Sequence, residues 1–156
     1  FWPLREMVRE LGGPDSLREL LAREESGESI GDRLSEVLGL AEATSSREEI
    51  FWAARRLFEA IARERPLVLA FEDVHWAEET FLDLIEYLGE GGRGAPILLV
   101  CVGRPELVER RPEWDDGKPN TSTLMLGPLS AAESEALIER LAPTLGGYRS
   151  DSVFSL

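Results

Sequence analysis

Residues 66–76 read Pro66-Leu67-Val68-Leu69-Ala70-Phe71-Glu72-Asp73-Val74-His75-Trp76. An apolar run that follows a proline and ends at an acidic pair is typical of a parallel strand buried on both faces. The carboxyl ends of such strands are where open α/β sheets bind their ligands. Two adjacent carboxylates there lose solvation and repel each other unless a cation or a proton relieves them. Glu72 and Asp73 are therefore the first candidates for a functional site.

A second apolar run follows at Ile97-Leu98-Leu99-Val100-Cys101-Val102 and leads into Gly103-Arg104-Pro105-Glu106. Its cysteine is predicted to be a small buried strand residue. Residues 79–88, between the two runs, carry apolar side chains at helical spacing, and a short third strand is predicted at 123–126. This alternation of helices and strands is typical of a parallel α/β sheet.

The strongest helical pattern lies just before the first strand. Its apolar positions are Ile50, Ala53, Ala54, Leu57, Phe58 and Ile61. Ser46-Arg47-Glu48-Glu49 fits a capping box, in which each end satisfies a backbone amide of the other. A second capping box, Ser130-Ala131-Ala132-Glu133, opens a last helix that is predicted to run through Leu141.

Three shorter helices are predicted at the start of the chain, over residues 1–11, from Pro14 onward and over residues 30–39. The segments between the predicted helices and strands are polar or rich in glycine and proline, which indicates loops. These loops are residues 26–29, 89–94 and 112–120, and residues 146–156 are predicted to be a frayed tail or linker.

Composition excludes several classes of partner. The 156 residues carry a formal net charge of −13, which repels the phosphates of nucleic acids and anionic lipids. We therefore expect no direct nucleic-acid binding by this segment. No apolar stretch approaches the roughly 20 residues that span a bilayer, so no membrane contact is expected. A single cysteine excludes an intrachain disulfide and fits the cytoplasm.

In this order and spacing, the motifs resemble the middle of a P-loop ATPase domain of the STAND class. These are AAA-related modules of bacterial signalling regulators, of the LuxR type or associated with cyclases. Residues 67–78 resemble the Walker B strand, and residues 98–107 resemble the strand that ends in a sensor arginine. Leu126-Gly127-Pro128-Leu129-Ser130 with Glu133 resembles the segment that closes the nucleotide core. The resemblance covers residues 46–141.

The resemblance implies a partial ASCE-type three-layer α/β fold. Its parallel strands would lie near 67–72, 97–102 and 123–126, with flanking helices, and the first core strands would be missing. In this family the missing phosphate-loop strand lies beside the third of these strands. We therefore expect residues 123–126 to lose their neighbour and to become an isolated extended segment.

The resemblance also implies a domain organisation. A partial ATPase domain would span residues 1–145, with a helical part at 1–45 and the core at 46–141, followed by a tail at 146–156. The expected partners are ATP and other domains of the same polypeptide, and a homo-oligomer is compatible with the family. The expected location is the cytoplasm.

The family's chemistry assigns roles to three side chains. The resemblance implies that Glu72 orients Mg²⁺ and that Asp73 polarises the attacking water. Glu72 and Asp73 would thus be the metal residues, and Asp73 and Arg104 the catalytic residues. The family more often has aspartate first, which leaves the division of labour between the two open. Arg104 would bind the γ-phosphate and report its loss on hydrolysis.

The phosphate-binding loop of the family is absent from these residues. There is no G-x-x-x-x-G-K-[ST] sequence, and the only lysine is Lys118. The glycine-rich turn at 89–94 follows a helix and precedes a strand, the reverse of a phosphate loop. In the family the loop precedes the helix near Phe1, so we expect a fragment that lacks the Walker A segment and does not turn over ATP by itself.

Each candidate residue also has a structural interpretation. Asp73 can cap the helix that follows it, and Arg104 can pair with a glutamate of the next turn. His75 is more often a packed, hydrogen-bonded residue than a switch. Trp76 is predicted to be a packing anchor.

Three functions follow from these alternatives. The first is an ATP-binding or ATPase switch module of a cytoplasmic bacterial regulator, with Mg²⁺ and ATP as cofactors. The second is a non-catalytic protein-interaction module derived from such an ATPase. The third, a phosphatase-like metal site, needs further acids at other strand ends, and the second strand ends instead in Gly103-Arg104.

Overall fold

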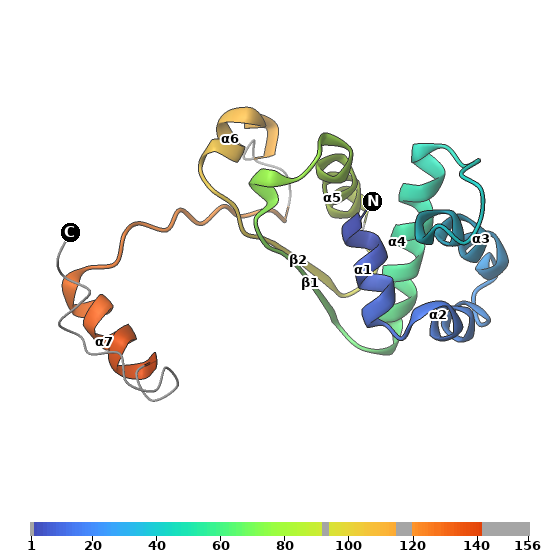
Figure 1. Ribbon diagram of the computed structural model, residues 1–156, viewed down its shortest axis with the longest axis horizontal. Helices are drawn as coiled ribbons and strands as arrows, with labels where there is room; N and C mark the ends of the chain where they lie inside the picture. Colours follow the sequence, from blue (N-terminus) through green and yellow to red (C-terminus); the bar gives the residue numbers. More distant parts are fainter. Residues whose placement is uncertain (1, 92–93, 115–119, 142–156) are drawn as a thin grey trace. The chain divides into compact units, whose positions relative to one another are not determined.

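The computed structural model describes residues 2–91, 94–114 and 120–141. It divides the chain into two compact units, Phe1–Asp116 and Gly117–Leu156. The first unit is rich in helices and contains a two-stranded parallel sheet, so the predicted α/β class is confirmed at this level (Figure 1). The tail predicted over 146–156 lies outside the described residues. None of the described helices combines the length and apolar character needed to cross a lipid bilayer.

Three short helices open the chain and confirm its predicted helical start. They are α1 (Trp2–Glu10), α2 (Gly13–Leu21) and α3 (Gly27–Leu38). The loop predicted at 26–29 is wrong, because Gly27 already begins α3. Helix α3 ends at Leu38 and is capped by Gly39, whose φ of 74° is a left-handed conformation that glycine adopts without steric cost.

A single carboxylate fastens the connector after α3. Glu36 accepts hydrogen bonds from the backbone amides of Thr44 and Ser45 at 2.9 and 2.8 Å, and from both hydroxyls at 3.0 and 2.8 Å. The amide of Ser45 contributes most to stabilising the ionised form, and the pKa of Glu36 is lowered to about 2.

Helix α4 (Arg47–Glu64) is the longest element described, and its predicted capping box is confirmed. The Ser46 hydroxyl accepts from the Glu49 amide at 3.2 Å, and the Glu49 carboxylate accepts from the Ser46 amide at 2.9 Å. The apolar face of α4 packs against the sheet and against α5, as the helical spacing of its residues predicts.

The sheet is a β–α–β unit formed by β1 (Leu67–Phe71), α5 (Glu79–Gly91) and β2 (Ile97–Cys101). The strands are parallel neighbours in a register that runs from Leu67 opposite Ile97 to Phe71 opposite Cys101. The predicted loop at 89–94 is wrong in its first part, because α5 continues to Gly91. The core lies between the helices and one face of the sheet, and its largest fully buried side chains are Leu4, Val8, Ile30, Leu34, Leu57, Phe58, Leu82 and Leu84.

The other face of the sheet is bare in the described part of the first unit. Val68 and its register partner Leu98 are 60% and 57% exposed. The predicted burial of β1 on both faces is therefore wrong here, because α1, α4 and α5 lie on one side of the strands (Figure 1). Cys101 is exposed rather than buried, although neighbouring atoms desolvate its thiol enough to raise its pKa to about 11.

Short elements follow both strands of the first unit. They are the 3₁₀ turn η1 (Val74–Trp76), helix α6 (Glu106–Arg110) and the 3₁₀ turn η2 (Pro112–Trp114). Helix α6 was not predicted, since five residues are too few to show a helical period. Part of the loop predicted at 112–120 is η2, and residues 115–119 lie outside the description.

The second unit contains one described helix, α7 (Ala131–Leu141). Its predicted capping box is confirmed, because the Ser130 hydroxyl accepts from the Glu133 amide and the Glu133 carboxylate accepts from the Ser130 amide. The strand predicted at 123–126 is wrong. Residues 121–130 have no regular secondary structure.

Leu57→Ala should lower the free energy of unfolding of the chain by about 2–5 kcal/mol, because it removes a fully buried side chain and leaves a cavity in a packed core. Urea denaturation followed by circular dichroism measures the change. Leu40→Ala is the matched control, since Leu40 is 60% exposed and its loss should change stability little. Equal effects of the two substitutions would contradict the described core.

Glu36→Gln should flatten the dependence of stability on pH between about 4.5 and 2. The lowered pKa of Glu36 means that its stabilising contribution is present above the ordinary value of 4.5 and is lost as the pH falls towards 2. Thermal unfolding midpoints across this range test the prediction. Glu42→Gln is the control, because Glu42 is exposed and makes no hydrogen bond among the described residues.

Candidate functional site

The two strand ends meet at one edge of the sheet. Beyond the last register pair, the amide of Val102 donates to the carbonyl of Phe71 at 2.8 Å, and the amide of Val74 donates to the carbonyl of Val102 at 3.1 Å. Parallel pairing thus continues past both strands. It brings the acidic pair after β1 and Gly103-Arg104 after β2 to the same edge, where open α/β sheets bind ligands.

The three side chains with predicted chemical roles are exposed. Glu72, Asp73 and Arg104 have no hydrogen-bond partner among the described residues, and the nearest charged contact is the Asp73 Oδ1 to His75 Nδ1 distance of 4.0 Å. The alternative in which Arg104 pairs with a neighbouring glutamate is not observed among the described residues. All three groups are available to a ligand.

Asp73 has a left-handed backbone conformation, with φ of 53° and ψ of 33°. Aspartate and asparagine enter this region more easily than most residues with a side chain. The Asp73 carbonyl accepts from the Trp76 amide at 2.9 Å and so begins η1. Its carboxylate makes no capping hydrogen bond, so the structural alternative of a helix cap is not observed.

The rings of His75 and Trp76 are only 5.1 Å apart, but the His75 side chain is buried and the Trp76 side chain is exposed. The His75 side chain is 8% exposed, which confirms packing, but neither ring nitrogen has a hydrogen-bond partner among the described residues. Trp76 is 76% exposed, so its predicted role as a packing anchor is wrong.

Gly103 allows the two strand ends to approach closely. A Cβ atom at this position would lie 3.0 Å from Val74 Cγ2 and 3.4 Å from Leu107 Cδ2. Val74 and Leu107 are both buried, so neither can move away freely. A side chain at position 103 would therefore push η1 and α6 apart.

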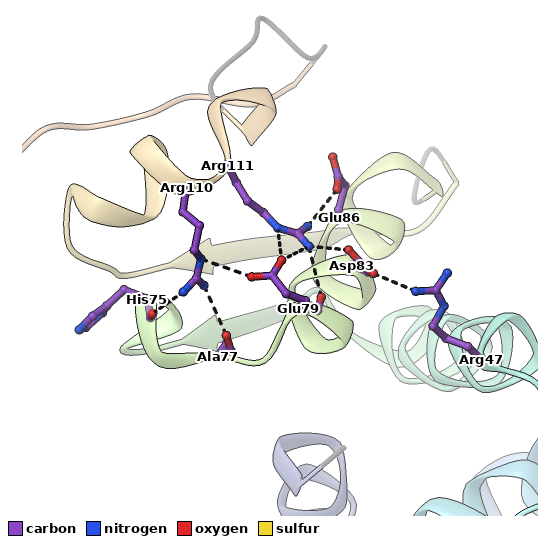
Figure 2. Close-up of polar contacts among 8 residues, drawn as sticks. All are labelled: Arg47, His75, Ala77, Glu79, Asp83, Glu86, Arg110 and Arg111. Atoms are coloured by element: carbon purple, nitrogen blue, oxygen red, sulfur yellow. Dashed lines mark hydrogen bonds and ion pairs between the residues drawn. The ribbon is translucent and has the colours of Figure 1, made fainter.

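Two arginines that the sequence analysis missed hold this edge together. The Arg110 guanidinium donates to the carbonyls of His75 and Ala77 at 3.3 and 3.4 Å, and its Nε lies 3.4 Å from Glu79 Oε1 (Figure 2). Arg110 is the last residue of α6, in the segment that follows β2. Both carbonyls belong to the turn that follows β1. The side chain thus joins the two loops.

Arg111 is 8% exposed and anchors the same segment to α5. It donates to the carboxylates of Glu79 at 2.6 Å and Asp83 at 2.7 Å, and it lies 3.6 Å from Glu86 (Figure 2). Burial lowers the pKa of Arg111, and the hydrogen bonds to Asp83 and Glu79 more than offset it, so the pKa is raised. Asp83 also accepts from Arg47 of α4 at 3.0 Å.

A signal for this network exists in the sequence. Glu79, Asp83 and Glu86 are spaced i, i+4 and i+7, which places three acids on one face of α5. Such a face is usually solvated, and no local rule assigns Arg111 to it. The pairing therefore becomes visible only once β2 and α6 are placed beside α5.

The described residues contain no group of three His, Cys, Asp or Glu side chains that could hold a metal ion. A third protein carboxylate beside Glu72 and Asp73, which a phosphatase-like metal site needs, is therefore not observed in the described ranges.

Comparison with known proteins gives one partial match. The chain is similar to a protein of Rhizobium meliloti (strain 1021) that is described only as uncharacterized, with 39% identity over 100 residues. The match covers 62% of the chain and 9% of the relative, so the chain spans only a small part of that relative's length. No protein-family model and no solved structure matches the chain.

Gly103→Ala should lower the free energy of unfolding by about 1–3 kcal/mol, because the added methyl group overpacks the contact with Val74 and Leu107. Urea denaturation measures this loss. Gly94→Ala is the matched control, since nothing lies within 4 Å of a Cβ at that position. A neutral Gly103→Ala variant would show that the strand ends are less closely packed than described.

Proposed function

We propose that this chain is part of a nucleotide-dependent signalling switch of the STAND type, an AAA-related P-loop ATPase module. The observation that carries the proposal is the edge of the β1–β2 sheet. Two exposed carboxylates, Glu72 and Asp73, and an exposed arginine, Arg104, follow adjacent parallel strands and have no hydrogen-bond partner among the described residues.

The residues present fit Mg²⁺ and a nucleoside triphosphate. Mg²⁺ is usually held by one or two carboxylates, water and substrate phosphates, so it does not need a cluster of three protein ligands. Bound Mg²⁺ would neutralise the negative charge of the phosphates. Glu72 and Asp73 would hold the ion, Asp73 would also orient the attacking water, and Arg104 would donate hydrogen bonds to the terminal phosphate.

The remaining parts of such a site would come from elsewhere in a longer polypeptide. The 156 residues contain no phosphate-loop sequence, and the relative is far longer than the matched segment. We infer that ATP and other domains of the same polypeptide are the partners, in a cytoplasmic regulator that can form a homo-oligomer. In this arrangement nucleotide binding would switch conformation rather than drive rapid turnover.

A second function is favoured by a different observation. The bare face of the sheet, with Val68 and Leu98 exposed, is typical of a surface that contacts protein. With no phosphate-loop sequence in the chain, this face supports a non-catalytic interaction module derived from such an ATPase. The two functions differ in whether the full-length protein binds ATP.

Isothermal titration calorimetry of the full-length natural protein with Mg·ATP tests the proposal. We expect wild-type protein to bind and the Glu72→Gln/Asp73→Asn variant to bind at least about tenfold more weakly, because charged contacts to the ligand are lost. Asparagine tolerates the left-handed conformation of Asp73, so the backbone should be preserved.

Glu78→Gln is the control, since Glu78 is an exposed carboxylate of the same segment that lies beyond η1. It should bind Mg·ATP as wild type does. Wild-type protein that does not bind Mg·ATP would favour the interaction module. Equal binding by the double variant would show that the acidic pair does not serve the nucleotide.

A further inference from the structure

We propose that Arg110 and Arg111 are positioning residues that set the spacing between the acidic pair after β1 and Arg104 after β2. This inference rests on the proposed function and names residues of the same site. The arginines act through the backbone, because their described contacts are with the carbonyls of His75 and Ala77 and with acids of α5.

The first step is the link between the two loops. The carbonyls that Arg110 binds belong to residues on either side of Trp76, so one planar guanidinium fixes the turn that follows Asp73. Helix α6 begins two residues after Arg104 and is held in the core by Leu107, which is buried. The position of the loop after β2 therefore depends, through α6, on the position of the turn after β1.

The second step is the anchoring of α6 itself. Glu79 is shared by both arginines, with Oε1 3.4 Å from Arg110 Nε and Oε2 2.6 Å from Arg111 Nη2. Asp83 binds Arg111 on one side and Arg47 of α4 on the other (Figure 2). Because several carboxylates surround one guanidinium, α6 cannot slide along α5 without breaking more than one contact.

The third step separates positioning from stability. Exposed ion pairs add little net stability, and the side chains of the Arg110–Glu79 pair are 43% and 61% exposed. Small displacements at a site weaken function strongly, because reacting and binding groups must be held in register. Loss of Arg110 should therefore loosen the turn over residues 73–77 and weaken nucleotide binding more than it changes global unfolding.

The test compares Arg110→Gln, Arg111→Met and a control, Arg33→Met, in the full-length protein. Arg33 is also a partly buried guanidinium with several partners, Ser29 and Glu49, but it joins α3 to α4. Three quantities are measured: amide hydrogen exchange in a peptide covering residues 72–78, the dissociation constant for Mg·ATP, and the midpoint of urea unfolding.

We expect Arg110→Gln to speed exchange over 72–78 and to weaken Mg·ATP binding, each about tenfold, with a nearly unchanged unfolding midpoint. Arg110→Lys keeps the charge but not the two-pronged contact, so it should give intermediate values. Arg33→Met should lower the midpoint and leave the other two quantities unchanged. Arg111→Met should also speed exchange and weaken binding, but it should lower the unfolding midpoint as well, because it leaves the acids of α5 without their buried partner. Arg110→Gln therefore decides the positioning role.

A double variant tests the route of the effect. If Arg110 acts by placing Arg104, then Arg110→Gln should weaken binding less in an Arg104→Ala background than in the wild type. Wild-type protein that fails to bind Mg·ATP would overturn the proposed function. Wild-type binding together with unchanged affinity and unchanged exchange in Arg110→Gln would overturn the positioning role alone.

Discussion

A buried guanidinium needs acceptors around it, and Arg111 imposes this requirement on the first unit of the chain. The cost of removing its charge from water is offset only where Glu79 and Asp83 approach it from α5. That condition fixes where α6 packs and brings Leu107 into the core. The loop after β2 then has one path, on which Gly103 lies against Val74.

The parts of the fold that depend on local chemistry could be predicted from the sequence. The capping boxes at Ser46 and Ser130 are built within four residues, and the helices that follow them begin where those motifs predict. The β1–β2 pairing was also predictable, because two apolar runs joined by one helix have few alternatives. Whether both faces of the sheet are buried could not be predicted in this way, since it depends on which other layers cover the sheet.

The candidate site divides in the same way. That Glu72, Asp73 and Arg104 lie at one edge follows from parallel pairing alone. The left-handed turn at Asp73 and the exposure of Trp76 depend on how η1 closes, and no residue pattern specifies this. The role of Arg110 was missed because its acceptors are backbone carbonyls, which every residue possesses and which leave no signature in a sequence.

The bare face of the sheet has a consequence for handling the protein in solution. Apolar strands with open edges favour association between molecules, whereas a net charge of −13 holds molecules apart. Added salt shortens the range of that repulsion to about 8 Å at physiological ionic strength and leaves the apolar attraction in place. Colloidal stability of this chain should therefore decrease as ionic strength rises.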